Sequence, residues 1–244
     1  MPVAIISDLH SNIEALDAVL RDAESRGRID AVWCTGDVVG YGADPSAVIA
    51  RLRVLDAACV AGNHDLAACG KIGVEDFNPI AAGAALWQAA QLSDDEREWL
   101  AGLPLVRREG RSESAFTLVH GSLRAPEWEY LLDQEAAGAH FALQTTPYSA
   151  VGHSHYQFYV IEQRPRPRFV REGDVTLAAA RLILNPGSTG QPRDGDPRAG
   201  YILYDQDAAA ATWRRVEYDI AAAQKKIVAA GLDPWLAERL AIGH

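Results

Sequence analysis

Short apolar runs alternate with amphipathic segments along the first 61 residues. The run "VAII" at 3–6 is rich in β-branched residues and predicts a buried strand. "SNIE" at 11–14 predicts a helix start in which Ser11 is the N-cap and Glu14 completes a capping box. Apolar residues then recur at helical spacing until Gly27, and they are Ile13, Leu16, Leu20 and Ala23.

Two more strands and one more helix are predicted before residue 62. "AVWCT" (31–35) and "AACVA" (57–61) are typical of strands. Between them, 44–55 is typical of a helix that Asp44 caps and Pro45 begins. The alternation of strands and helices favours parallel pairing through right-handed crossovers.

The pattern changes after two further predicted helices at 77–90 and 93–102. We expect strands, separated by turn residues, within 103–109, 114–120, 148–154, 157–163, 175–185, 199–205 and 210–219. The prolines of "RPRPRF" (164–169) lack amide donors, which predicts a hairpin tip or surface loop there. The segment 219–244 is predicted to be helical, and a short last helix begins at 233–234.

A parallel first half and a more antiparallel second half favour an α/β fold. We expect two sheets packed face to face with helices outside. No repeat, linker or low-complexity tract interrupts the chain, which predicts a single domain over 1–244.

The composition is that of a globular protein, with 244 residues of which 48% are hydrophobic and 23% charged. The formal net charge of -10 makes the chain a poor nonspecific binder of nucleic acid and of anionic membranes. A phosphate-bearing substrate would therefore need a local source of positive charge.

The sequence predicts a cytoplasmic protein. Cys34, Cys59 and Cys69 form no close pair and no Cys-x-x-Cys, which is typical of buried thiols in a reducing compartment. The start "MPVAIISD" lacks the basic region of a signal peptide, and no apolar run reaches the roughly 18 residues of a membrane span. We expect no membrane partner, and the oligomeric state is left open.

Five short stretches place metal-ligand residue types where a predicted strand ends. They are "IISDLH" with Asp8 and His10, "CTGDVVG" with Asp37, "VAGNHD" with Asn63 and His64, "TLVHGS" with His120, and "AVGHSH" with His153 and His155. Open α/β sheets bind ligands in loops at the carboxyl ends of strands. Five of the seven histidines lie in these stretches, so the set predicts a metal site although each stretch alone is a common turn.

The types of donor indicate the class of metal. The set contains aspartate, asparagine and histidine but no cysteine, and such donors suit Mn, Fe, Zn, Ni or Co rather than a thiolate structural site. Two metals about 3.5–4 Å apart need a bridging carboxylate and roughly three or four protein ligands each. The five stretches hold enough ligands for such a pair.

The order D-x-H, G-D, G-N-H-D, H-G, G-H-x-H over residues 8–155 resembles the calcineurin-like metallophosphoesterase superfamily. The chain length and "NPGS" (185–188) resemble its small bacterial phosphodiesterase-like branch. The resemblance implies a four-layer α/β/β/α sandwich of two mixed sheets flanked by helices. It also implies a dinuclear enzyme that hydrolyses phosphodiesters or phosphomonoesters by attack of a hydroxide that bridges two divalent metal ions.

The same resemblance implies a role for each motif residue. The implied ligands are Asp8, His10 and His155 for one metal, Asn63, His120 and His153 for the other, and Asp37 as the bridge. His64 would bind no metal and would assist catalysis from the substrate side, with Asp65 orienting its ring. The metals would supply the positive charge that the acidic composition lacks.

Departures from the family pattern bear on the substrate. "GDVVGYG" and "AGNHD" lack the arginines of the "GDxVDRG" and "RGNHE" that protein Ser/Thr phosphatases and diadenosine tetraphosphatases carry. A hydrolase of either kind is the alternative function, and a non-catalytic interaction scaffold on the same fold is an alternative of a different class. His64 stands where some small phosphodiesterases have cysteine, so monoester hydrolysis is left open.

Two residues outside the motifs are candidate substrate contacts. Asn12 lies just past "DLHS", and Arg193 lies in the Gly- and Pro-rich 187–198 after the last motif. Either side chain has hydrogen-bond donors for a phosphate oxygen. We expect the substrate to be a small phosphate ester, with nucleotides among the candidates.

Overall fold

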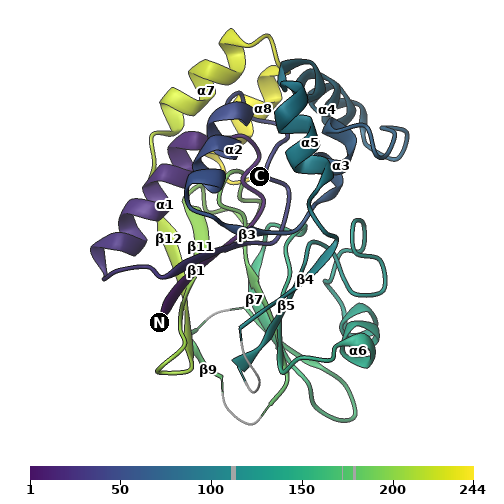
Figure 1. Cartoon of the computed structure of the whole chain (residues 1–244), viewed down its shortest axis with the longest axis vertical. Coiled ribbons are helices and arrows are strands. Elements are labelled where there is room, and N and C mark those ends of the chain that lie inside the picture. The colour runs from purple at the N-terminus through teal and green to yellow at the C-terminus, as the bar shows by residue number, and fades with distance from the viewer. Residues whose placement is uncertain (111–113, 172, 178–179) are drawn as a thin grey trace.

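The segments predicted as strands form two mixed sheets in the computed structural model (Figure 1), which describes residues 1–110, 114–171, 173–177 and 180–244. The first sheet has the order β3-β2-β1-β11-β12-β9, with β1 (Pro2–Ile6), β2 (Ala31–Cys34), β3 (Ala58–Cys59), β9 (Val175–Thr176), β11 (Ala199–Asp205) and β12 (Ala210–Val216). The second has the order β4-β5-β6-β10-β7-β8, with β4 (Val106–Glu109), β5 (Phe116–Val119), β6 (Tyr148–Ala150), β7 (Gln157–Ile161), β8 (Arg168–Val170) and β10 (Leu182–Pro186).

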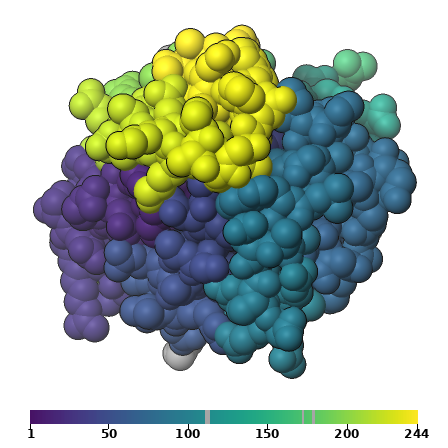
Figure 2. Space-filling view, turned by 90° about the horizontal axis from the view of Figure 1, so that it is seen from above, coloured from purple at the N-terminus to yellow at the C-terminus, as the bar shows by residue number. Residues whose placement is uncertain are grey.

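Helices flank the two sheets (Figure 1). They are α1 (Ile13–Ser25), α2 (Pro45–Val54), α3 (Asn63–Ala68), α4 (Pro79–Gln91), α5 (Asp94–Ala101), α6 (Gln134–Leu143), α7 (Ile220–Ala229), α8 (Pro234–Glu238) and a 3-10 turn, Arg239–Ala241. Residues of α4, α7 and α8 share an apolar cluster, and Figure 2 shows the C-terminal segment beside earlier parts of the chain at this end of the molecule. Across the described ranges, no helix is both long and apolar enough to cross a membrane.

The period-2 alternation of β1 explains the order of the layers. Val3 and Ile5 belong to the apolar cluster between the two sheets, while Ala4 and Ile6 belong to the cluster under α1 and α2. Both faces of β1 are therefore buried, which is why its sequence is a continuous apolar run. A separate cluster packs α6 on the second sheet. The expected four-layer α/β/β/α sandwich is confirmed.

The pairing of the strands brings many loops to one edge. β1, β2 and β3 are parallel neighbours in the first sheet. β5, β6 and β10 are parallel neighbours in the second. The carboxyl ends of parallel neighbours meet at one edge of their sheet, and these ends are followed by the sequence motifs.

The structure corrects the predicted start of α1. Its N-cap is Asn12, whose Oδ1 accepts from the backbone N of Ala15 at 3.1 Å, and not Ser11. Ser11 Oγ instead donates to Gln88 at 2.9 Å, and Glu14 forms an ion pair with Lys226. Each side chain of the expected capping box thus contacts a residue that is distant in the sequence instead of the backbone at the start of α1.

Other segments depart from the expected elements. The helices α3 and α6 were not predicted. The single strand expected at 175–185 is two strands, because β9 belongs to the first sheet and β10 to the second, and 178–179 lie outside the described residues. The first four residues of "RPRPRF" lie in the connection between β7 and β8, and the last two begin β8. The predicted hairpin tip is confirmed. Cys34 and Cys59 are register partners in β2 and β3, and both are buried free thiols, as expected.

We expect Phe116→Ala to lower the free energy of unfolding of the metal-free protein by about 3–5 kcal/mol. The ring is fully buried between the sheets, with its centroid 5.3 Å from Trp33 and 5.0 Å from Tyr204. Urea unfolding measures the change. The control Leu86→Ala, at a side chain that is 59% exposed on α4, should alter stability by less than about 0.5 kcal/mol. A similar loss for both variants would contradict this account of the core.

Candidate metal centre

The motif residues come together at the edge where the parallel strands end. Asp8 and His10 follow β1, Asp37 follows β2, Asn63 begins α3 after β3, His120 follows β5, and His153 and His155 follow β6. All seven side chains are buried. Segments more than a hundred residues apart in sequence therefore supply one cluster of donors.

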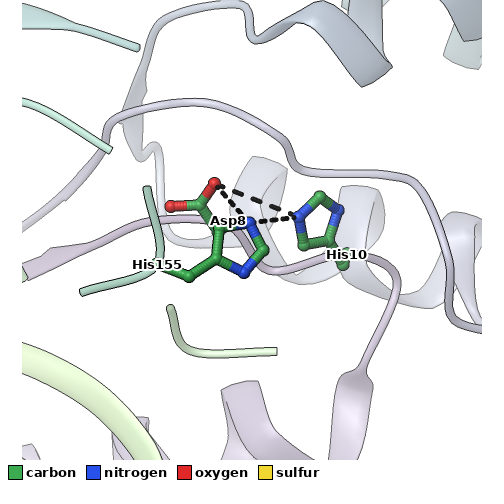
Figure 3. A group of neighbouring side chains, drawn as sticks. All are labelled: Asp8, His10 and His155. Carbon is green, nitrogen blue, oxygen red and sulfur yellow. Dashed lines mark hydrogen bonds and ion pairs between the residues drawn. The ribbon is translucent and has the colours of Figure 1, made fainter. Parts of the chain in front are cut away.

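The first ligand group consists of Asp8, His10 and His155 (Figure 3). His155 Nε2 lies 3.3 Å from Asp8 Oδ1 and 3.2 Å from His10 Nε2. His10 Nε2 lies 3.9 Å from the same Asp8 oxygen. Three donor atoms from two loops thus face one point, as the sequence motifs led us to expect.

The second ligand group consists of Asp37, His120 and His153. His120 Nε2 lies 3.3 Å from Asp37 Oδ2 and 3.1 Å from His153 Nδ1. The same Asp37 oxygen lies 3.7 Å from His10 Nε2, so this carboxylate stands between the two groups. Asn63 Oδ1 is buried and, among the described residues, has no hydrogen-bond partner.

These residues fit two divalent metal ions. Nitrogen donors of different histidines lie 3.1 and 3.2 Å apart, which a cation shared between them would explain. An unpartnered buried amide oxygen is costly unless something binds it, and Asn63 Oδ1 is such an atom. The mixture of imidazole, carboxylate and amide donors suits first-row divalent metals.

Burial sets the protonation states of the ligands. It lowers the pKa of His10 well below its usual range and that of His153 to about 3, so both imidazoles are neutral, as metal binding requires. Burial would also lower the pKa of His120, but the Asp37 carboxylate raises it to about 9. Burial would raise the pKa of Asp37, but the imidazoles of His120 and His64 hold it well below its usual range.

Backbone carbonyls fix the orientation of the ligand imidazoles. His120 Nδ1 donates to Thr35 O at 2.9 Å and His10 Nδ1 lies 3.2 Å from Val39 O. These contacts use the outer ring nitrogen, and they leave Nε2 facing the cluster. His153 is turned the other way, because its Nε2 contacts Trp128 O at 3.2 Å and its Nδ1 faces the cluster.

His64 and Asp65 are placed differently from what the resemblance implies. The His64 ring lies beside the ligands, with its centroid 5.0 Å from that of His10, and its Nδ1 has no partner among the described residues. Asp65 does not hold this ring: its oxygens accept from the backbone N of Gly62 and of Val39, both at 3.0 Å. Asp65 therefore fixes two motif loops, and its expected role of orienting His64 is corrected.

Burial also shifts the pKa of this pair in opposite directions. It lowers the pKa of His64 to about 4, with Arg193 lowering it further and Asp37 opposing. It raises the pKa of Asp65 to about 7, together with the charge of Asp37. Both directions follow from removing a charged form from water.

The two candidate substrate contacts have different surroundings. Arg193 lines the open cavity over Asp37, His64 and His155, where its Nη2 lies 3.3 Å from the Tyr41 hydroxyl. Asn12 is buried away from that cavity. Its Oδ1 caps α1 and its Nδ2 donates to Gly190 O at 2.8 Å, so both polar atoms are already used within the protein.

Comparison with known proteins agrees with this geometry. A family model described as the calcineurin-like phosphoesterase superfamily domain matches residues 1–209. The chain belongs to this superfamily. The membership expected from the motifs is confirmed.

Two relatives match the chain over nearly its whole length, and a third matches about half of it. A solved metallophosphoesterase from Sphaerobacter thermophilus is 41% identical, with 100% of both chains covered and a TM-score of 0.87. The Uncharacterized protein MJ0912 of Methanocaldococcus jannaschii is 38% identical over 99% of this chain and 98% of its own length. A symmetrical bis(5'-nucleosyl)-tetraphosphatase of Glaesserella parasuis is 29% identical over 132 residues, and the match covers 53% of this chain and 47% of that relative. The matched region thus spans about half the length of each of these two proteins.

The end of β10 and the loop after it hold the loops of the candidate metal ligands in place, which the sequence analysis did not predict. Asn185 Nδ2 donates to Gly152 O at 2.9 Å and to Ser154 Oγ at 3.0 Å, on either side of His153. Ser188 Oγ donates to Asp8 O at 2.8 Å. The signal was the "NPGS" motif, which was noted for its resemblance to the family but was given no structural role.

We expect Gly62→Ala to weaken metal binding by at least about tenfold. A Cβ at Gly62 would lie 2.1 Å from Asp37 Oδ1, so the carboxylate shared by both groups would have to move. Metal content after dialysis and calorimetric titration measure the loss. The matched control is Gly83→Ala on α4, where an added Cβ meets nothing within 4 Å and metal content should not change. Equal metal content in both variants would show that Gly62 does not position Asp37.

Proposed function

We propose that the chain is a dinuclear metal-dependent phosphoesterase that hydrolyses a small phosphodiester or phosphomonoester. The observation that carries the proposal is the pair of ligand groups that meet at Asp37, in a member of the calcineurin-like phosphoesterase superfamily. All residues implied as ligands are present and buried together, which disfavours a non-catalytic scaffold. We propose a single functional domain over 1–244 that acts in the cytoplasm, on the sequence evidence above.

The proposed ligand sets are those implied by the sequence motifs. They are Asp8, His10 and His155 for one ion, Asn63, His120 and His153 for the other, and Asp37 for both. The candidate ions are two of Mn, Fe, Zn, Ni and Co. When bound, such ions supply hydroxide at neutral pH and positive charge for the phosphate oxygens.

Arg193 is the proposed phosphate-binding side chain. Its guanidinium lies 5.6 Å from the centroid of the Tyr41 ring and donates to Gln191 Oε1 at 3.1 Å, so two neighbours hold it at the cavity. Arg193 Nε has no partner among the described residues and is left to bind an anion. The guanidinium missing from the "GDVVGYG" and "AGNHD" motifs is thus supplied by the loop after β10.

His64 is the proposed proton donor to the leaving oxygen, in the protonated form that the negative charge of a bound phosphate favours against the effect of burial. Its ring is fixed between Tyr41, with centroids 4.4 Å apart, and Phe77, at 5.0 Å. Its backbone N donates to Asp37 Oδ1 at 3.0 Å, which ties its position to the shared ligand. The unpartnered Nδ1 is available to a substrate oxygen, as general acid catalysis requires.

A second candidate is a dinucleoside polyphosphate hydrolase. The similarity to symmetrical bis(5'-nucleosyl)-tetraphosphatases over 131–140 residues favours it. The absence of the two arginine-bearing motifs disfavours this candidate and a protein Ser/Thr phosphatase equally, and the similarity to tetraphosphatases favours the former of the two. Rates with aryl mono- and diesters, cyclic nucleotides, diadenosine tetraphosphate and a phosphopeptide distinguish these activities.

We expect Asp37→Asn to abolish hydrolysis of every ester in this panel and to remove most of the second metal. The amide cannot supply the charge that both ligand groups share. Metal analysis of protein purified without added metal, followed by assays with each metal restored, measures both effects. The matched control is Asp56→Asn, an exposed carboxylate that also has a positive φ, at 47° against 53° for Asp37. A wild-type protein that binds the metals and hydrolyses none of these esters would overturn the proposed function.

We expect His64→Ala to lower kcat by about 10²- to 10⁴-fold while both metals stay bound. The reason is that His64 faces the substrate side of the cavity and is not needed for either ligand set. Steady-state kinetics with a good and a poor leaving group separate the roles, since a lost general acid slows the poor leaving group more. His64 also lies close enough to His10 and Asp37 to share a metal with them. Loss of metal from His64→Ala would therefore make it a ligand instead.

A further inference from the structure

The cavity over the metal ligands has a wall of aromatic side chains. It is open to solvent, and Asp37, His64 and Arg193 line it together with these aromatic side chains. Phe77 comes from the segment between α3 and α4, and Trp128 and Tyr130 come from the segment between β5 and α6. The first segment carries no proposed metal ligand, and the second begins with the proposed ligand His120.

Two of the rings contact each other, and the third lies on a candidate metal ligand in the same cavity. Phe77 lies edge-on to Trp128, with centroids 5.0 Å apart, and edge-on to His64, also at 5.0 Å. Tyr130 stacks on the ligand His153, with centroids 4.0 Å apart and an interplanar angle of 17°. A substrate group that extends from the metal centre on this side is therefore placed to contact an aromatic ring.

These rings are accessible to a ligand. Tyr130 is 49% exposed, and Phe77 and Trp128 are half-buried. Large aromatic side chains at the mouth of a concave site are a common means of binding a planar group. Base–aromatic stacking is the general form of this contact for nucleotides.

The charged side chains of the cavity differ between the aromatic wall and the proposed phosphate position at Arg193. Arg193 lies beside Tyr41 and His64, while Asp76, adjacent to Phe77 in sequence, lines the cavity with the aromatic residues. A carboxylate there disfavours a second phosphate next to the aromatic wall. It favours instead an uncharged group with hydrogen-bond donors, such as the exocyclic amine of a base.

We propose that Phe77, Trp128 and Tyr130 form an aromatic subsite for the nucleobase of the substrate, so that this phosphoesterase acts on nucleoside phosphate esters. The inference rests on the proposed function, because it places the phosphate at the metals and Arg193. The base then stacks on the aromatic wall, and the sugar spans the distance to the phosphate.

The test compares two phosphonates on the metal-loaded protein by calorimetric titration. They are the analogues of adenosine 5′-monophosphate and of ribose 5-phosphate in which CH₂ replaces the ester oxygen, so neither is hydrolysed and they differ only in the base. We expect the adenosine analogue to bind at least about fivefold more tightly. In Trp128→Leu and Tyr130→Leu, the ratio should fall to within about twofold with unchanged metal content.

Two variants serve as matched controls. Trp235→Leu replaces a tryptophan that is 41% exposed on α8 and outside the cavity, and it should keep the full ratio. Tyr130→Phe keeps the ring and should also retain the preference. The adenosine analogue should quench a tryptophan fluorescence component that is lost in Trp128→Leu and kept in Trp235→Leu.

The outcomes separate the subsite from the proposed function. Equal binding of the two phosphonates to wild-type protein would overturn the subsite and leave the phosphoesterase proposal standing. A preference for phenylphosphonate with none for the adenosine analogue would overturn the nucleobase assignment. If neither phosphonate binds and no ester is hydrolysed with both metals present, the proposed function fails and the subsite fails with it.

Discussion

The contact on which the site depends is the sharing of one carboxylate, Asp37, between donors from both sheets. Its Oδ2 lies 3.7 Å from Nε2 of His10, which follows β1, and 3.3 Å from Nε2 of His120, which follows β5. Its Oδ1 accepts from the backbone of His64. A fully buried carboxylate is unfavourable without compensating charge, so its position depends on the imidazoles around it. The face-to-face packing of the sheets brings these residues together, because His10 and Asp37 follow strands of the first sheet and His120 follows a strand of the second.

The backbone around this carboxylate is held in an uncommon conformation. Positive φ angles occur at five of the proposed ligands: Asp8, His10, Asp37, His153 and His155. For residues other than glycine this region costs on the order of 1–3 kcal/mol each, and it persists only where the surroundings determine it. Those surroundings include Asn185 and Ser188, whose side chains bond the loops that carry His153 and Asp8. The end of β10 and the loop after it thus help to hold the strained backbone, which turns side chains of separate loops toward one point.

The parts of the structure that local chemistry dictates were predictable from sequence. "VAII" predicted a buried strand, which is β1. The five motifs each follow a predicted strand, and the resemblance that they carry implied the candidate ligands that the fold brings together. Contacts between distant segments were not predictable. Asp65 was expected to hold His64, but it is N3 of α3 and bonds the backbone of Val39. Asn12 was expected to contact substrate, but it caps α1 and bonds Gly190. Each outcome depends on a partner that only the fold supplies.

The distribution of arginines explains how an acidic chain presents positive charge to an anion. Many of its arginines are neutralised by a neighbouring carboxylate, as in Arg51 with Asp17 at 2.7 Å and Arg198 with Asp196 at 2.6 Å. Within the described part of the chain Arg193 forms no such ion pair, and it is oriented by neutral groups. A guanidinium already paired with a carboxylate gains little from a phosphate, so an unpaired guanidinium at the cavity is the better site for an anion. The net charge of -10 therefore describes the surface and not the cavity, where Arg193 and the metal ligands set the local field.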